Sequence, residues 1–146
     1  MKKVSPPKVV GGALFLWSLA YCVLVYFSFV SSSAEKLEIL VEQGTIKPEY
    51  AAYILTIPDW VRALTIALAT IRLVGSIGVI LNKMWAFYAF AFALFLTLVI
   101  MYRGFVLAGV ADVIRPSQIG VELGFIAISM FAVWYSFRLR KKLAIK

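Results

Sequence analysis

Arg72 and Glu122 are the ionisable residues placed most firmly inside the apolar stretches of this sequence. A charged side chain at the middle of a bilayer costs about 2.5–3.5 kcal/mol on insertion scales, so it should face other helices and find polar partners. Arg72 has two interpretations. As a functional residue it serves an anion or proton pathway, or anchors a headgroup or ligand. As a structural residue it bonds hydroxyls and carbonyls and fixes the register of the helices.

Other polar residues fall near the depth of Arg72 when positions are counted along each apolar stretch from the same side: Ser18, Tyr21, Cys22, Thr97 and Ser129. Glu122 lies only about one turn inside the opposite boundary, and Arg62 lies at a matching depth. Two pairings are open, Arg62 with Glu122 or Arg72 with Glu122. Depth favours the first, because a rise of about 1.5 Å per residue puts Arg72 roughly 9 Å deeper than Glu122.

Small residues recur at helical spacing in two places, Gly75-x-x-Gly78 and Gly120-x-x-x-Gly124. Glycines at such spacing let two helix backbones approach closely. We expect this packing to occur within one chain. The alternative is a face through which the chain forms a dimer.

Catalytic patterns are missing from the sequence, which has no His and a single Cys, Cys22. A His-based metal site, a Ser–His nucleophile and a thiol pair are therefore excluded. The acids do not cluster as a magnesium site for phosphate transfer requires. We expect no enzyme activity, no catalytic residue, no metal and no cofactor.

Composition places the chain in a membrane, because 63% of its residues are hydrophobic and 15% are charged. Soluble domains are nearer 45–50% apolar and about 25% charged. The net charge of +8 does not indicate nucleic-acid binding, because the basic residues flank the apolar stretches instead of forming a patch. Expected partners are membrane lipids and either another membrane protein or a second copy of this chain.

The apolar stretches predict an all-α fold, a bundle of four membrane helices in one domain, with spans at about 9–31, 60–81, 85–102 and 118–137. The polar segment 32–57 should form a small helical cap outside the membrane. Thr56 followed by Asp59, with Pro58 between them, is typical of a helix start. Ser32-Ser33-Ala34 looks like a signal cleavage site, but the preceding apolar region is too long, so we expect a retained span.

Most Lys and Arg residues lie at both chain ends and at Lys83, which four spans would place on one side of the membrane. The positive-inside rule makes that side cytoplasmic, so both termini should be cytoplasmic. The expected location is the inner membrane of a bacterium.

A likeness to a known family rests on Ile57-Pro58-Asp59-Trp60, on the glycine-rich end of the second span, and on Lys83-Met84-Trp85-Ala86. The chain resembles small four-span inner-membrane proteins of bacteria that are often labelled hypothetical or, loosely, sugar transporters. The resemblance covers most of the length and implies the fold, not an established activity. The chain departs from the family at Arg72, where a small or apolar residue is expected.

Three functions follow as hypotheses, in this order. The first is a non-enzymatic accessory subunit that stabilises a larger membrane assembly. The second is a small oligomeric transporter or permease that uses Arg72. A membrane enzyme comes last, because the sequence offers no nucleophile with a base.

Overall fold

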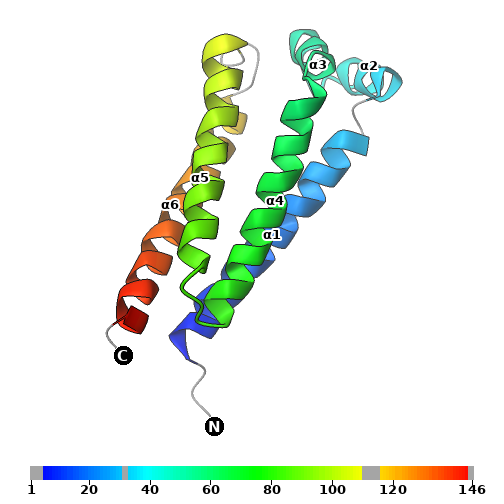
Figure 1. Cartoon of the computed structure of the whole chain (residues 1–146). Coiled ribbons are helices and arrows are strands. Elements are labelled where there is room, and N and C mark those ends of the chain that lie inside the picture. The colour runs from blue at the N-terminus through cyan, green and yellow to red at the C-terminus, as the bar shows by residue number, and fades with distance from the viewer. Residues whose placement is uncertain (1–4, 31–32, 110–115, 145–146) are drawn as a thin grey trace.

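The computed structural model describes residues 5–30, 33–109 and 116–144, and its elements over these ranges are all helices (Figure 1). In chain order they are α1 (Pro6–Val30), α2 (Ala34–Glu42), α3 (Pro48–Leu55), α4 (Asp59–Ile80), α5 (Ala86–Tyr102), the π-helical turn η1 (Arg103–Leu107) and α6 (Pro116–Ala144).

Four of these helices are long and apolar enough to cross a membrane: α1, α4, α5 with its continuation η1, and α6. The four predicted spans are confirmed as helices, with ends that differ by a few residues. Figure 1 shows both chain ends at one end of the molecule, here called the terminal end. Helices α2 and α3 lie at the other end, the cap end, and belong to the segment for which a small helical cap was predicted.

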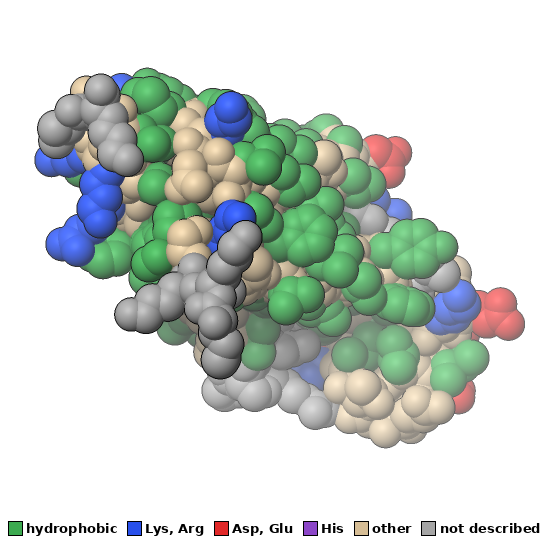
Figure 2. Space-filling view, turned by 90° about the horizontal axis from the view of Figure 1, so that it is seen from below, with side chains coloured by type: hydrophobic (Ala, Val, Ile, Leu, Met, Phe, Trp, Pro, Cys, Tyr) green, Lys and Arg blue, Asp and Glu red, His purple; other side chains and the backbone are tan. Residues whose placement is uncertain are grey.

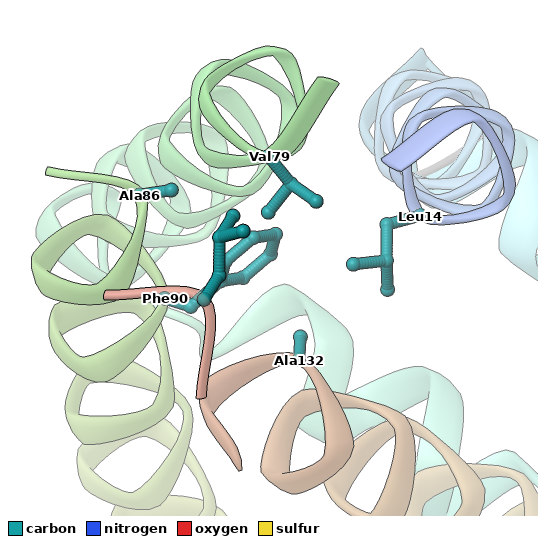
Figure 3. Packing of buried hydrophobic residues seen from close by; sticks show 6 residues of the cluster. Leu14, Val79, Ala86, Phe90 and Ala132 are labelled. Atoms are coloured by element: carbon teal, nitrogen blue, oxygen red, sulfur yellow. The ribbon is translucent and has the colours of Figure 1, made fainter. Parts of the chain in front are cut away.

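The larger of two buried apolar clusters lies in the terminal half of the molecule, where the helices converge, and a smaller one, of Leu68, Ala93 and Leu96, lies between α4 and α5. Figure 3 shows side chains from all four long helices meeting there: Leu14, Val79, Ala86, Phe90 and Ala132. Helix α1 packs against α4, α4 against α5, and α5 against α6. Burial of such side chains removes apolar surface from the surroundings and fills the space between backbones, which fixes the helices at this end.

Three glycines allow this convergence. A Cβ on Gly11 would lie 2.6 Å from Ile80 Cγ1 and 2.8 Å from the Ile80 backbone nitrogen. A Cβ on Gly78 would lie 2.8 Å from the ring of Trp85, and one on Gly75 would lie 3.2 Å from the ring of Phe90. The predicted packing role of Gly75 and Gly78 within the chain is confirmed. Gly11 was not singled out from the sequence.

The connection between α4 and α5 is a short hairpin at Asn82. Asn82 has a φ of 54°, in the left-handed region that Asn tolerates better than most residues. The Lys83 amide donates to the Gly78 carbonyl at 2.8 Å, which satisfies one of the last carbonyls of α4. The turn therefore brings α5 back directly against α4.

The helix start predicted at Thr56 is wrong. Thr56 instead follows the last turn of α3, and its hydroxyl donates to the Tyr53 carbonyl at 2.7 Å. Pro58, with φ −65° and ψ 151°, precedes the first residue of α4. The hydroxyl that would have capped α4 is already bonded within the preceding turn, and Thr hydroxyls commonly make such local bonds.

Helix α6 continues to Ala144, beyond the predicted span end at residue 137. Its last turns contain Arg and Lys, which favour helix as strongly as most apolar residues do. Cations near a helix C-terminus are also stabilised by the helix dipole, and α6 carries Lys141 and Lys142 in its last turn.

Candidate functional site: a buried arginine where four helices meet

Arg72 of α4 is 1% exposed and is the largest of the described side chains that are fully buried. Its Nη2 donates to Thr97 Oγ1 on α5 and to Ser129 Oγ on α6, each at 2.9 Å. Both hydroxyls donate their own protons to carbonyls four residues earlier on their helices, at 2.8 and 2.7 Å. These bonds turn the oxygen lone pairs toward the guanidinium, so one side chain ties α4 to α5 and α6.

Helix α1 contributes aromatic rings to the same site. The guanidinium carbon of Arg72 lies 4.9 Å from the Trp17 ring centroid and 4.7 Å from that of Tyr21. The faces of aromatic rings attract a cation at such distances, more strongly where water is excluded. Phe125 of α6 packs against both rings, with centroids 6.0 Å from Trp17 and 5.1 Å from Tyr21. All four long helices therefore contribute to the surroundings of Arg72.

Several donors at this site have no acceptor. Within the described part of the chain, Arg72 Nε, Arg72 Nη1 and Trp17 Nε1 are buried and make no hydrogen bond. Guanidinium and indole N–H groups can only donate, so rotating the groups does not relieve the mismatch. A buried donor without a partner costs about 1–3 kcal/mol, and more when it is charged. The site is short of acceptors.

Glu122 of α6 is exposed and makes no ion pair within 4 Å among the described residues. Arg72 is the cation whose charge acts on it. Its own charge reaches Tyr50 of α3: burial raises the pKa of Tyr50, and the negative charge of Glu122 raises it further, with a smaller contribution from Tyr53. Glu122 thus lies on the cap side of Arg72, toward α3.

The predicted pairing of Arg62 with Glu122 is not formed in this structure. Arg62 is half-buried on α4, and the sequence predicted a matching depth for Glu122. However, ten residues separate Arg62 from Arg72, and at about 3.6 residues per turn this places them roughly 80° apart around the helix. With Arg72 aimed at α5 and α6, Arg62 is turned away from that direction. Depth alone does not report this rotation.

Close packing at Gly120 and Gly124 was also predicted within the chain, and this prediction is wrong. No atom lies within 4 Å of a Cβ built on either glycine. Val121 and Leu123 between them are 59% and 58% exposed, so this part of α6 points outward. The interpretation left open by the sequence is a face for a partner helix.

Some of the other polar residues that the sequence placed at the depth of Arg72 do lie around it. Tyr21, Thr97 and Ser129 do surround Arg72, whereas Ser18 bonds the Leu14 carbonyl within its own helix. Trp17 was missed. It lies one turn before Tyr21, so the i, i+4 spacing of two aromatic residues was the signal that could have revealed it.

Comparison with family models, with curated proteins and with solved structures gave no match. The resemblance drawn from the sequence therefore stays an expectation. In the described part of the chain, no group of three His, Cys, Asp or Glu residues could hold a metal ion. Arg72 and its surroundings form the candidate site.

Proposed function

We propose that this chain is a multi-pass membrane protein that binds a small organic anion at Arg72 and acts as a carrier for it. The observation that supports this function is the buried guanidinium of Arg72, whose Nε and Nη1 lack acceptors beside the equally unpaired Trp17 Nε1. A purely structural arginine would be expected to use its donors on neighbouring hydroxyls and carbonyls. Among the described residues only Nη2 makes well-formed hydrogen bonds to hydroxyls, and the Tyr21 hydroxyl is a further, weaker polar partner of the guanidinium.

The chemistry of the site favours a carboxylate. Its oxygens only accept hydrogen bonds, and charge-assisted bonds from guanidinium to carboxylate are among the strong ones in proteins. A ligand charge would also neutralise Arg72, which has no ion pair within 4 Å among the described residues. The rings of Trp17, Tyr21 and Phe125 offer apolar walls, which suit an organic body better than a hydrated inorganic ion.

Access to the site is proposed from the cap end. Tyr21 and Phe125 lie one turn nearer that end than Trp17 and Ser129, and their rings touch edge to face. They cover Arg72 on the side where Glu122 is exposed. Opening of this ring pair would admit the ligand. Since basic residues gather at the terminal end, that end is assigned to the cytoplasm and the ring pair to the outer side.

Replacing Arg72 by Met separates the carrier function from a structural role. Purified protein in detergent is melted with and without a panel of organic carboxylates, and uptake of those that stabilise it is measured in proteoliposomes. Wild type should be stabilised by at least one carboxylate. Arg72→Met should lose this effect and the uptake while keeping its ligand-free melting temperature, because Thr97 and Ser129 still bond their own carbonyls.

Arg62→Met is the matched control, since it removes the same charge from the same helix outside the site. It should keep the carboxylate response. If no carboxylate stabilises wild type and Arg72→Met alone melts far below it, Arg72 is structural and the proposal fails. Replacing Arg72 by Met also removes the desolvation cost of a buried charge that has no ion pair among the described residues, so we expect the melting temperature to stay unchanged.

A second candidate function is the accessory subunit, and the uncovered glycines of α6 favour it. Gly120 and Gly124 leave a shallow strip on an outward-facing helix where a partner backbone fits closely. Gly124→Leu should release any protein that co-purifies in mild detergent. Gly12→Leu is the control, because a Cβ on Gly12 also meets nothing within 4 Å but lies on a different helix. Equal retention of the partner by both variants would count against this function.

A further inference from the structure

A pocket with a largely apolar lining and two cations lies at the terminal end, between the start of α1 and the last turns of α6. It has a volume of about 300 Å³ and is lined by Pro6 and Pro7 on α1 and, on α6, by Trp134, Tyr135, Arg138, Leu139 and Lys142. This pocket is independent of Arg72, which is buried deeper in the molecule among other helices.

The two cations of the pocket, Arg138 and Lys142, lie on one face of α6. Trp134, Arg138 and Lys142 follow one another at a spacing of four residues, so they form a row on one face of α6. The guanidinium of Arg138 lies 4.2 Å from the centroid of the Trp134 ring, which holds its position. Leu139, 7% exposed, anchors the neighbouring row in the core. Two cationic side chains, Arg138 and Lys142, therefore line this pocket together with the Trp134 and Tyr135 rings.

Negative charge is absent from this part of the described chain. Every described acid lies in α2, α3, the first turn of α4 or at Glu122. Glu122 precedes Arg138 by 16 positions on α6, which is about 24 Å along the helix at about 1.5 Å per residue. Figure 2 views the molecule from below, and its red side chains lie only toward the right-hand side of that view, apart from most of the blue ones. Within the described ranges, Arg138 and Lys142 therefore have no nearby Asp or Glu to neutralise them.

We propose that this pocket binds the phosphate headgroup of an anionic phospholipid. Arg and Lys between membrane helices on one leaflet are the recurring receptors for such headgroups. Trp134 and Tyr135 are residue types that favour the membrane–water interface, which is where a lipid phosphate lies. The outward face of α6 above the pocket offers exposed apolar side chains to acyl chains, with Met130 58% and Phe131 46% exposed.

Free phosphate shares the charge and the acceptor oxygens of the headgroup, so the experiment must distinguish the two. The protein is placed in nanodiscs of phosphatidylcholine alone or with phosphatidylglycerol, and retained lipid is counted by native mass spectrometry. Inorganic phosphate is then added as a competitor. We expect selective retention of phosphatidylglycerol that millimolar phosphate does not displace. Displacement by phosphate at that concentration would overturn the lipid assignment.

Two double variants with equal charge provide the decisive comparison. Arg138→Gln with Lys142→Gln empties the pocket of charge, whereas Arg140→Gln with Lys141→Gln removes two cations that lie over other rings. The first should bind phosphatidylglycerol about 30-fold more weakly, equivalent to about 2 kcal/mol at about 1.4 kcal/mol per tenfold change. The second should stay near wild type.

Equal weakening by both double variants would mean that the whole basic end attracts anionic lipid without a built pocket, and the proposal would fail. Unchanged retention by the first variant would also overturn it. Melting temperatures in phosphatidylcholine alone check that both variants fold, since the dipole of α6 is affected equally by the loss of Lys141 or Lys142.

Discussion

The terminal half and the cap half of the molecule differ in how closely their helices pack at glycine residues. In the terminal half, glycines let helices touch: Gly11 fits against Ile80 and Gly78 against Trp85. In the cap half, Gly120 and Gly124 touch nothing, and the acid Glu122 stands exposed. The long helices converge at the terminal end, and in Figure 1 the pair α5 and α6 diverges from α1 and α4 toward the other end.

Arg72 lies where these two halves join, which explains how a lone charge is tolerated there. Toward the terminal end the packed core leaves it no room to move. Toward the cap end the Tyr21 and Phe125 rings lie over it, beside the smaller cluster around Leu68. Close-packed interiors change between discrete arrangements and do not deform continuously, so motion that exposes Arg72 should occur on the cap side.

The largest effect should come from breaking the packed half at Phe90. Phe90 is 1% exposed and lies against Gly75, whereas Phe95 on the same helix is 58% exposed. Phe90→Ala should lower the free energy of unfolding by about 3–5 kcal/mol, because it leaves a cavity. Phe95→Ala should change it by about 0.5 kcal/mol or less. Melting in detergent measures both, and similar losses would show that the packed half is not distinct.

The next effect concerns adjacent glycines. Gly11→Ala puts a methyl group against the Ile80 backbone, which cannot move as a flexible side chain does, and should destabilise by about 1–3 kcal/mol. Gly12→Ala meets open space and should stabilise the helix by about 0.5–1 kcal/mol. Thermal melts of the two variants show whether each substitution raises or lowers the stability. Stabilisation by both would mean that α1 is not held against α4 as closely as the structure indicates.

A smaller effect is expected in the cap half at Glu122. Because this side chain is exposed and makes no ion pair among the described residues, Glu122→Leu should change stability by about 0.5 kcal/mol or less. Combined with Arg62→Leu, the losses should add, as they do for residues that do not interact. A coupling well above 0.5 kcal/mol in a double-mutant cycle would restore the Arg62–Glu122 pair that depth predicted.

The structure shows which features of this chain could be predicted from its sequence. Hydropathy located the four long helices, and counting residues along them placed Thr97 and Ser129 beside Arg72, because depth is proportional to residue number. The rotation of each helix about its own axis is set by how it packs against its neighbours. When apolar residues cover all sides of a helix, its sequence does not show which side faces the neighbours. That is why Arg62 was paired with Glu122, and why Gly120 and Gly124 were assigned to the interior although they face outward.

The smallest effect tests whether the charge of Glu122 reaches the cap. Burial raises the pKa of Tyr50, and Glu122 raises it further. A phenol whose pKa is higher in the folded state stabilises the fold fully below its unfolded pKa of about 10, and this contribution is lost as pH rises through the folded pKa. Melting temperatures should therefore fall above about pH 10, and less steeply in Tyr50→Phe than in wild type.

Glu122→Gln should lower the pKa of Tyr50, measured by NMR of labelled tyrosine rings. Lys8, remote at the terminal end, gives the control, because Lys8→Gln should leave that resonance unmoved. If the Tyr50 pKa does not respond to Glu122→Gln, then Glu122 faces away from α3, and the cap half is not organised around its charge.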